Sequence, residues 1–309
     1  MANGVKVGLL KIYRKMVSIL LKTNIQKFSF TKKLHKLIVP NLVPKSVKIE
    51  GHTIFIDPTD YLYLSTKKYE PFEKDIIEQI VKEGDIVVDI GANLGYFTLI
   101  LARKVGNKGR VFAFEPDPDM FKLLKKNVKI NGYKNVTLIK KATFNKSGKL
   151  KLLIYADKGD SGVICGKNTK STATAVTIDA VKLDDYFKKY PKKIDFIKMD
   201  IEGSEGMAFA GMENIFKNND NVKMITEFFP KWLENHPINA DKYYKLLQKQ
   251  NLSIYSIDED RKRVTAVNKR SQIINDRRTD YYYSNLLCLK GSDKQQFIEH
   301  LKAKLTKSK

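Results

Sequence analysis

The sequence predicts an α/β fold, in which a doubly wound, mostly parallel sheet of seven strands carries helices on both faces. Short apolar runs that are typical of buried strands alternate with helical patterns from Asp85 onward. Glycine or proline stands at several of the joins between them. The chain has 309 residues, 42% of them hydrophobic, which is enough for a substantial core.

Two extensions flank this pattern. We assign residues 1–45 to a basic helical N-terminal extension, 46–292 to the α/β domain and 293–309 to a basic C-terminal helix. Residues 5–28 carry apolar side chains at helical spacing with lysines on another side, which predicts an amphipathic helix. Two short apolar runs around Glu50 and Gly51 predict a hairpin at 47–56.

The elements of the α/β domain follow in order. Pro71 opens a helix that ends at Gly84, since proline fits the first helical turn and glycine a helix end. Residues 148–182 interrupt the alternation with two extra strands, at 150–155 and 174–178, and the polar stretch 259–280 predicts a loop. The other predictions are strands at 86–90, 110–115, 136–140, 194–200, 222–228, 252–257 and 283–289, and helices at 95–104, 118–131, 183–189, 204–217 and 240–250.

The net charge of the chain is compatible with two classes of binding partner. A net charge of +23 fits nucleic acid or an anionic membrane surface. However, nearly all of the positive charge is lysine spread along the whole chain, so a lysine-rich composition explains it equally well. The helix at 5–28 can lie on a membrane or pack on the protein's own body.

The cysteines and apolar runs indicate a compartment. Cys165 and Cys288 match no metal-binding spacing and suit a reducing interior. The apolar run Met16 to Leu21 is too short to span a bilayer, and no small-residue cleavage site follows it. We therefore expect a cytoplasmic protein. Residues 5–28 could also place it at the inner face of the membrane as a peripheral protein. A homo-oligomer is compatible with the sequence as well.

The stretch VVDIGANLGYFTLILA, residues 87–102, joins a buried strand to a buried helix through a glycine-containing bend. In an open parallel sheet, ligands bind at such bends beyond the carboxyl ends of the strands. The nicotinamide pattern G-x-G-x-x-G, begun at Gly91, fails at two of its three positions. The pattern acid-x-G-x-G-x-G fits Asp89, Gly91 and Gly95, and departs only at Asn93, a residue type that tolerates positive φ.

A second acid follows on the next strand. Glu115 ends the run VFAFE twenty residues after Gly95, where a carboxylate can accept both hydroxyls of a ribose. Pro116 ends the strand and directs the loop. Taken alone, Asp89 could simply cap a helix or loop, and Glu115 could be a solvent-exposed acid at the end of a strand. Together, on successive strands, they predict a nucleoside-containing cofactor.

Five blocks in this sequence resemble the FkbM family of S-adenosylmethionine-dependent methyltransferases, in the family's order and over about residues 50–290. They are VVDIGANLGYFTLILA, VFAFEPDPDMFKLLKKNVKINGYKNVTLIKKA, VKLDDYF, IDFIKMDIEGSEGMAFAGM and KMITEFFP. The resemblance implies a class I methyltransferase fold, S-adenosylmethionine as the cofactor, and O-methylation, commonly of a sugar or other hydroxyl.

The resemblance also implies site residues by position. The block DIEGSE supplies Asp200, Glu202 and Glu205, and Asn145 stands where the family usually has an acid. The implied cofactor-binding residues are Asp89, Gly91, Ala92, Asn93, Gly95, Tyr96, Phe97, Glu115, Pro116, Asp117, Ala142 and Asp200.

Methyl transfer to a hydroxyl requires in-line placement and a group that takes the proton. Asp200 and Glu227 end neighbouring strands and His236 lies just beyond, so these three are the catalytic candidates. A solvated acid at the sheet edge explains Glu227 equally, and an ordinary surface histidine explains His236. Glu202 and Glu205 share one face if both are helical, although Glu205 also suits the start of a helix.

Aromatic residues follow the same strand. Phe229 and Trp232 can stack on a sugar face or pack in the core, and with Glu202 and Glu205 they are the substrate-binding candidates. Several acids at one rim can also hold a divalent cation. Because their spacing is not diagnostic, we assign no metal ligands.

Two other functions remain in competition with a glycan O-methyltransferase. The positive charge is compatible with an RNA methyltransferase. However, enzymes that methylate base nitrogens carry an N-P-P-[YF] motif after the fourth strand, and this chain has MDIEG there. We therefore do not expect nucleic acid as a partner. A non-catalytic, membrane-associated adaptor would use the N-terminal helix, but the pair Asp89 and Glu115 favours an enzyme. We expect a sugar or glycan acceptor.

Overall fold

The computed structural model describes residues 45–56, 69–154, 161–163, 174–190, 193–273, 284–291 and 294–307. The chain divides into two compact units, Met1–Tyr69 and Glu70–Lys309. In the first unit, β1 (Ser46–Ile49) and β2 (His52–Phe55) form the predicted antiparallel hairpin. The helix predicted at 5–28 lies outside the described residues.

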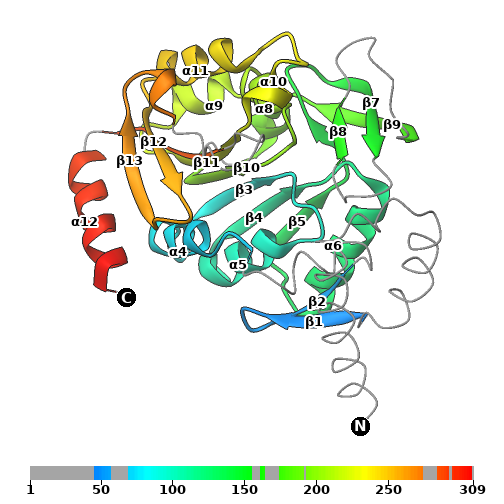
Figure 1. Cartoon of the computed structure of the whole chain (residues 1–309). Coiled ribbons are helices and arrows are strands. Elements are labelled where there is room, and N and C mark those ends of the chain that lie inside the picture. Colours follow the sequence, from blue (N-terminus) through cyan, green and yellow to red (C-terminus); the bar gives the residue numbers. More distant parts are fainter. Residues whose placement is uncertain are drawn as a thin grey trace, which may run out of the picture. The chain divides into compact units, whose positions relative to one another are not determined.

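The second unit is built on an eight-stranded sheet (Figure 1). Five neighbouring strands are parallel, and β14 runs antiparallel between β11 and β12, which confirms the predicted mostly parallel sheet, although it has eight strands and not the seven predicted. In spatial order the strands are β13 (Arg263–Val267), β12 (Ser253–Asp258), β14 (Ser284–Leu289), β11 (Lys223–Phe228), β10 (Phe196–Met199), β3 (Ile86–Ile90), β4 (Arg110–Phe114) and β5 (Val136–Ile139).

Helices cover both faces of this sheet, as predicted (Figure 1). On one side lie α4 (Pro71–Ile80), α5 (Tyr96–Val105) and α6 (Pro118–Ile130). On the other lie α8 (Glu205–Phe209), α9 (Glu213–Asn218) and α11 (Ala240–Lys249). A large apolar cluster packs the sheet against this second layer, with Phe114, Phe216 and Tyr243 fully buried.

A smaller sheet accounts for the interruption at 148–182. Its order is β6-β9-β7-β8, and β7 and β9 are the two predicted extra strands. The strands are β6 (Ala142–Thr143), β7 (Gly148–Ile154), β8 (Ser161–Val163) and β9 (Thr174–Val181). The remaining elements are α7 (Leu183–Tyr186), η2 (Phe187–Lys189), α10 (Pro230–Leu233), η3 (Arg270–Gln272) and α12 (Lys294–Lys307), of which α12 contacts α4.

Two local predictions are wrong. The loop expected at 259–280 contains β13, which pairs with β12 because Val264 and Val267 are buried beside it. The single helix expected at 204–217 is two helices, α8 and α9. At the break, a Cβ on Gly211 would lie 2.3 Å from the Phe144 carbonyl oxygen, so only glycine lets the two backbones meet there.

Among the residues that the structure describes, no helix is both long enough and apolar enough to cross a bilayer.

Candidate cofactor and catalytic site

The bend after β3, residues 89–95, which we call the glycine loop, packs against the backbone that follows β10. Gly91 has φ +81°, and a Cβ there would lie 1.9 Å from the Asp200 carbonyl oxygen. The Asp200 N–H donates to the Ile90 carbonyl at 3.0 Å. Asn93 has φ 50°, which confirms that asparagine takes the left-handed conformation here. The loop and the acidic block are therefore in direct contact.

Each backbone N–H of the glycine loop from Gly91 to Gly95 donates to a group of the chain itself. Gly91 and Ala92 donate to the Phe114 carbonyl, both at 3.0 Å. The other acceptors are the Glu115 carboxylate for Asn93 at 2.7 Å, the Asn93 side chain for Leu94 at 2.7 Å, and the Ala92 carbonyl for Gly95 at 2.8 Å. A phosphate-binding loop needs such N–H groups unpaired. This loop therefore does not fit a pyrophosphate.

Glu115 fastens the glycine loop to the end of β4. Its Oε2 accepts from the Asn93 N–H and its Oε1 from the Asp117 N–H at 2.8 Å. The side chain is buried, and burial raises the pKa of Glu115 to about 8, against the opposing effect of both hydrogen bonds. Glu115 is therefore not a solvent-exposed acid at the end of a strand, and that alternative interpretation is wrong. Each carboxylate oxygen keeps a further acceptor position.

Asp89 and Asp117 each stabilise the start of a helix. Asp89 is buried and accepts a hydrogen bond of 2.5 Å from the Thr98 hydroxyl of α5, and burial raises its pKa to about 6. Asp117 caps α6 by accepting from the backbone of Asp119 at 2.8 Å and Met120 at 3.1 Å. Both acids therefore position the loops on which the predicted cofactor contacts stand.

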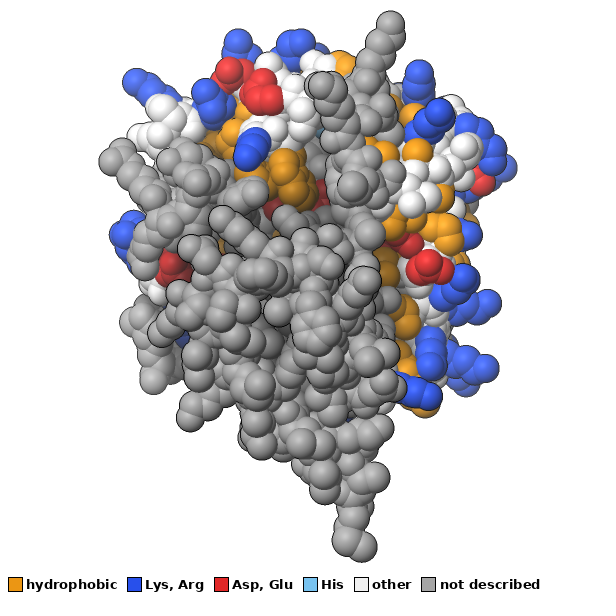
Figure 2. Space-filling view, turned by 45° about the vertical axis from the view of Figure 1, so that its right-hand side comes forward, with side chains coloured by type: hydrophobic (Ala, Val, Ile, Leu, Met, Phe, Trp, Pro, Cys, Tyr) orange, Lys and Arg blue, Asp and Glu red, His pale blue; other side chains and the backbone are white. Residues whose placement is uncertain are grey.

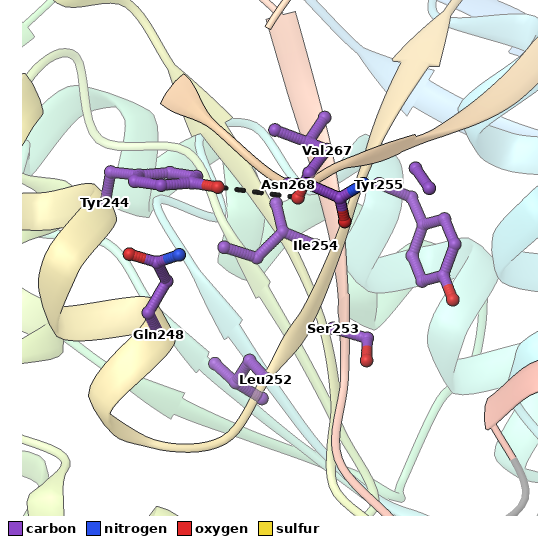
Figure 3. Close-up of a pocket in the computed structure, with 9 residues that line it drawn as sticks. Tyr244, Gln248, Leu252, Ser253, Ile254, Tyr255, Val267 and Asn268 are labelled. Atoms are coloured by element: carbon purple, nitrogen blue, oxygen red, sulfur yellow. Dashed lines mark hydrogen bonds between the residues drawn. The ribbon is translucent and has the colours of Figure 1, made fainter. Parts of the chain in front are cut away.

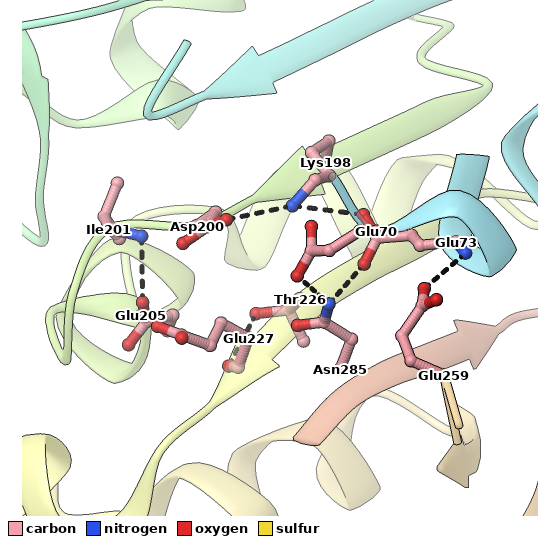
Figure 4. A network of polar contacts seen from close by, with 10 residues as sticks. All are labelled: Glu70, Glu73, Lys198, Asp200, Ile201, Glu205, Thr226, Glu227, Glu259 and Asn285. Atoms are coloured by element: carbon pink, nitrogen blue, oxygen red, sulfur yellow. Dashed lines mark hydrogen bonds and ion pairs between the residues drawn. The ribbon is translucent and has the colours of Figure 1, made fainter. Parts of the chain in front are cut away.

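Lys198 lies buried in the middle of β10, where its ammonium joins several carboxyl groups (Figure 4). Its Nζ is 3.2 Å from Glu73 Oε1 and 3.2 Å from Asp200 Oδ2. It also stands 4.7 Å from the ring centre of Phe97, in the first turn of α5. Burial lowers the pKa of Lys198, but the surrounding carboxylates outweigh it and hold the pKa well above its usual value.

Residues far apart in the sequence complete this group. The Asn285 amide of β14 donates to Glu73 and, at 2.8 Å, to Glu70. Glu259, from the turn after β12, accepts from the backbone N–H groups of Phe72 and Glu73 at 3.0 and 2.6 Å and so caps α4. Burial raises the pKa of Glu70 to about 7 and that of Glu73 well above its usual value, against the attraction of Lys198.

Glu205 folds the DIEG turn. Its Oε1 accepts from Ile201 N at 2.9 Å and Gly203 N at 3.3 Å, while its buried Oε2 has no hydrogen-bond partner among the described residues. Burial raises the pKa of Glu205 to about 7. Glu202 has φ 56° and precedes the helix, so only Glu205 is helical and the condition for the two acids to share a helical face is not met.

Glu227, at the end of β11, faces the same acids. Its Oε2 is shielded from solvent and lacks a hydrogen-bond partner within the described part of the chain. Burial, then Asp200, Glu205 and Glu202, raise the pKa of Glu227 well above its usual value. We refer to Glu70, Glu73, Asp89, Asp200, Glu205 and Glu227 around Lys198 as the acidic network.

The segment after β11 closes over the DIEG turn. Trp232 is half-buried and stacks on the buried Phe229 with ring centres 4.8 Å apart. A Cβ on Gly203 would lie 2.7 Å from the Trp232 Cβ, so the turn and this aromatic pair are in contact. His236 is buried, and its Nδ1 has no partner among the described residues; burial lowers its pKa. It is therefore not an ordinary surface histidine.

The remaining predicted contacts surround the glycine loop. Tyr96 and Phe97 are buried at the start of α5 with their rings edge to face, and Pro116 is half-buried. Ala142 is buried in a small apolar cluster that includes Met207 of α8.

The sequence motifs did not indicate Glu70, Glu73, Lys198, Glu259 or Asn285 as members of the site. A signal for two of them was present. Lys198 is a charge within the apolar strand FIKM, and Glu73 lies on the apolar face of α4. A buried charge needs a partner, so each of these two positions indicates the other.

A pocket of about 230 Å³ lies elsewhere, between α11 and the β12–β13 pair (Figure 3). It is lined by Tyr244, Gln248, Leu252, Ser253, Ile254, Tyr255, Ala266, Val267 and Asn268, none of which is a predicted site residue. Within the described residues, no group of three His, Cys, Asp or Glu side chains has an arrangement that could hold a metal ion.

Comparison with known proteins identifies the family of this chain. Residues 89–253, just over half of the chain, match the methyltransferase FkbM domain. An uncharacterized protein of Methanocaldococcus jannaschii, MJ1452, is 33% identical over 99 residues, which cover 31% of this chain and 37% of that protein. Methyltransferase 1 of Beauveria bassiana is 24% identical over 150 residues, covering 43% and 60%.

A third relative has a named acceptor. The hexuronic acid methyltransferase AglP of Haloferax volcanii is 28% identical over 160 residues, which cover 47% of this chain and 59% of that protein. The chain thus spans between about a third and three-fifths of the length of these three relatives. From the matched domain, which contains both the glycine loop and the DIEG turn, we conclude that the chain belongs to the FkbM family of S-adenosylmethionine-dependent methyltransferases.

Proposed function

We propose that this protein transfers the methyl group of S-adenosylmethionine to a hydroxyl of a sugar or glycan. Three observations support the proposal. The family match at 89–253 falls inside the domain that we assign to 46–292. One relative is named a hexuronic acid methyltransferase. The glycine loop, Glu115 and the acidic network lie together at the carboxyl ends of the parallel strands, where such folds bind ligands.

The residues of the glycine loop fit this methyl donor. A ribose needs a carboxylate at the end of β4, and Glu115 keeps acceptor positions beyond its two backbone bonds. A sulfonium needs no anion-binding N–H groups, and the loop leaves none unpaired from Gly91 to Gly95. The bound donor would supply an electrophilic methyl carbon, and the protein must place and deprotonate the acceptor.

The proton acceptor is a carboxylate at the rim of the sheet. Glu227 and Asp200 end neighbouring parallel strands, and Glu227 has an oxygen without a partner among the described residues. Because its pKa is raised, an ionised Glu227 is a stronger base than an exposed glutamate. His236 is the alternative base, since burial keeps its imidazole neutral at neutral pH.

The acceptor's sugar ring would stack on Trp232. This side chain is half-buried, is supported from below by Phe229, and adjoins the DIEG turn through Gly203. An aromatic face presented next to carboxylates suits a pyranose, which has apolar C–H faces and hydroxyl edges. On the face shown in Figure 2, the described Lys and Arg side chains are spread out rather than gathered in one stripe, which does not favour a nucleic-acid acceptor.

The observation that carries the proposal is the Glu115 carboxylate, buried at the tip of β4 and bound to the glycine loop. We expect Glu115→Ala to weaken S-adenosylmethionine binding at least about tenfold in calorimetry, because a ribose contact and the loop tether are both lost. Asp119→Ala, at an exposed acid four residues along, is the matched control and should leave the affinity unchanged. Equal affinities in wild type and Glu115→Ala would overturn the role of Glu115.

The acceptor is tested separately. Methyl transfer to a panel of glycans, with uronic acid-containing oligosaccharides first, should give product with wild type, and less with Glu115→Ala when the donor is limiting. Product with RNA and none with any glycan would contradict the proposed acceptor class while leaving the methyl donor in place.

A further inference from the structure

The acidic network contains more carboxyl groups than Lys198, the one cation that contacts it within the described ranges, can balance. Lys198 pairs with Glu73 and Asp200, and Asn285 donates to Glu73 and Glu70. Glu205 and Glu227 each keep one shielded oxygen with no hydrogen-bond partner in the described part of the chain. An ionised carboxylate without a partner is costly in such surroundings. The network therefore holds protons when nothing else compensates its charge.

The network also adjoins the place proposed for the methyl donor. The Asp200 backbone touches Gly91 so closely that no Cβ fits between them. Lys198 faces Asp89 across paired strands and lies over the Phe97 ring, which follows the glycine loop. Charge placed beside the glycine loop will therefore act on Asp89, Lys198 and Asp200 at short range.

We infer that the acidic network exchanges a proton for the sulfonium charge of the methyl donor, releasing the proton on donor binding and recovering one when the methyl group leaves. The inference rests on the proposed function and adds to it a way of distinguishing the charged donor from its neutral product. The ionised network attracts a sulfonium, whereas the protonated network suits a neutral sulfide.

The exchange keeps the charge of the site constant through the chemical step. The acceptor oxygen forms a bond to the methyl carbon, and the carbon–sulfur bond breaks with its electron pair going to sulfur. The hydroxyl proton goes to a carboxylate of the network, for which Glu227 is placed. One positive charge disappears at sulfur while one negative charge is neutralised on the network, so no net charge has to be created in a shielded site.

The titration of the network supports this exchange. The pKa values of Glu70 and Glu205 are raised to about 7, chiefly by burial, so a proton is available near neutral pH. The charged or titratable groups that face the network are Glu70 and Glu73 from α4, Asp89 from β3, Lys198 and Asp200 from β10, Glu202 and Glu205 from the DIEG turn and α8, Glu227 from β11, and Glu259 from the turn after β12.

The test compares two ligands that differ by the methyl group and its charge. S-adenosylmethionine and S-adenosylhomocysteine are titrated into the full chain at pH 7 by calorimetry in two buffers of different ionisation enthalpy. Since a group with a pKa of about 7 is half protonated at that pH, we expect up to about half a proton more to be released with S-adenosylmethionine.

Variants assign this proton to the chain rather than to the ligand's own amino group. Glu227→Gln keeps the shape of the side chain and should reduce the extra release about twofold. Glu213→Gln, at an exposed acid at the start of α9, is the matched control and should leave the release unchanged. Circular dichroism confirms that each variant is folded.

The outcomes separate this inference from the proposed function. Binding of both ligands with equal proton release, or an extra release that Glu227→Gln and a second variant, Glu205→Gln, both leave intact, would overturn the inference and leave the methyl donor in place. Failure of both ligands to bind would remove the proposed function, and the inference with it.

Discussion

Two polar regions meet at the carboxyl ends of the parallel strands, and they differ in how completely they are satisfied. Around the glycine loop, every backbone N–H from Gly91 to Gly95 has an acceptor, and both Glu115 oxygens accept a bond. In the acidic network, Glu205 and Glu227 keep oxygens that lack partners among the described residues. The first region has a fixed geometry, whereas the second has an uncompensated charge.

This difference indicates which of the two regions changes its protonation when a ligand binds. A fully bonded loop holds its shape before a ligand arrives, which lowers the cost of binding. A surplus of shielded carboxyls has the opposite property, because it gains stability only when a cation or a proton arrives. The network is therefore the part of the site that responds to what is bound.

The largest effect on the fixed region should come from a substitution that adds a Cβ atom to the glycine loop. We expect Gly91→Ala to lower the free energy of unfolding by about 4 kcal/mol or more, because the new Cβ would overlap the Asp200 carbonyl and the backbone has φ +81°. Chemical denaturation measures this. Gly132→Ala is the matched control, with φ +76° and no atom within 4 Å of the new Cβ, and should cost only about 1 kcal/mol. Equal losses would show that backbone conformation, and not the contact, makes Gly91 necessary.

Removing the cation tests the charged region. We expect Lys198→Met to cost about 3 kcal/mol at pH 8, because buried carboxylates lose the ammonium that compensates them. The cost should shrink at pH 5.5, because burial raises the pKa of Glu73 well above its usual value and a protonated Glu73 no longer needs the ammonium. Urea denaturation at the two pH values checks this, with the exposed Lys122→Met as control. A cost that is the same at both pH values would mean that Lys198 acts through packing alone.

Wild type should itself respond to pH. Burial raises the folded-state pKa of Asp89 to about 6, of Glu70 and Glu205 to about 7, and of Glu115 to about 8. With respect to these four groups the folded state binds more protons than the unfolded chain, so their contribution to stability is full below about pH 4 and is lost as pH rises through 6 to 8.

We expect the free energy of unfolding to fall by about 2 kcal/mol or more from pH 5.5 to pH 8.5, because a single group with a pKa of about 7 alone contributes about 1.4 kcal/mol per pH unit up to its pKa. Denaturation without ligand at several pH values measures it. Stability that rises over this range would contradict the protonated network.

The smallest effect should come from one bond at the border of the two regions. Thr98→Val removes the hydroxyl that donates to Asp89 and should cost about 1 to 2 kcal/mol, since a buried carboxylate loses its donor. Thermal unfolding should show the loss, and lowering the pH below 6 should reduce it because Asp89 then becomes neutral. A loss as large as that of Lys198→Met would place Asp89 at the centre of the network instead of its edge.

The sequence revealed the fixed region better than the charged one. Gly91, Asn93 and Glu115 are close in sequence, and their roles depend on local backbone geometry that a motif records. Glu73, Lys198 and Asn285 meet only because three distant elements pack together, and no spacing in the chain encodes that contact. The break at Gly211 was missed for the same reason, since Phe144 comes from another strand region.

The turn that follows β12 has a consequence for any shortened form of this protein. Glu259 holds the first turn of α4 in place, and Asn285 holds the carboxyl of Glu73 on that helix. Both contacts join parts of the chain on either side of residues 89–253. A fragment trimmed to the matched span would lack Glu70, Glu73, Glu259 and Asn285, and with them most of the groups that surround Lys198.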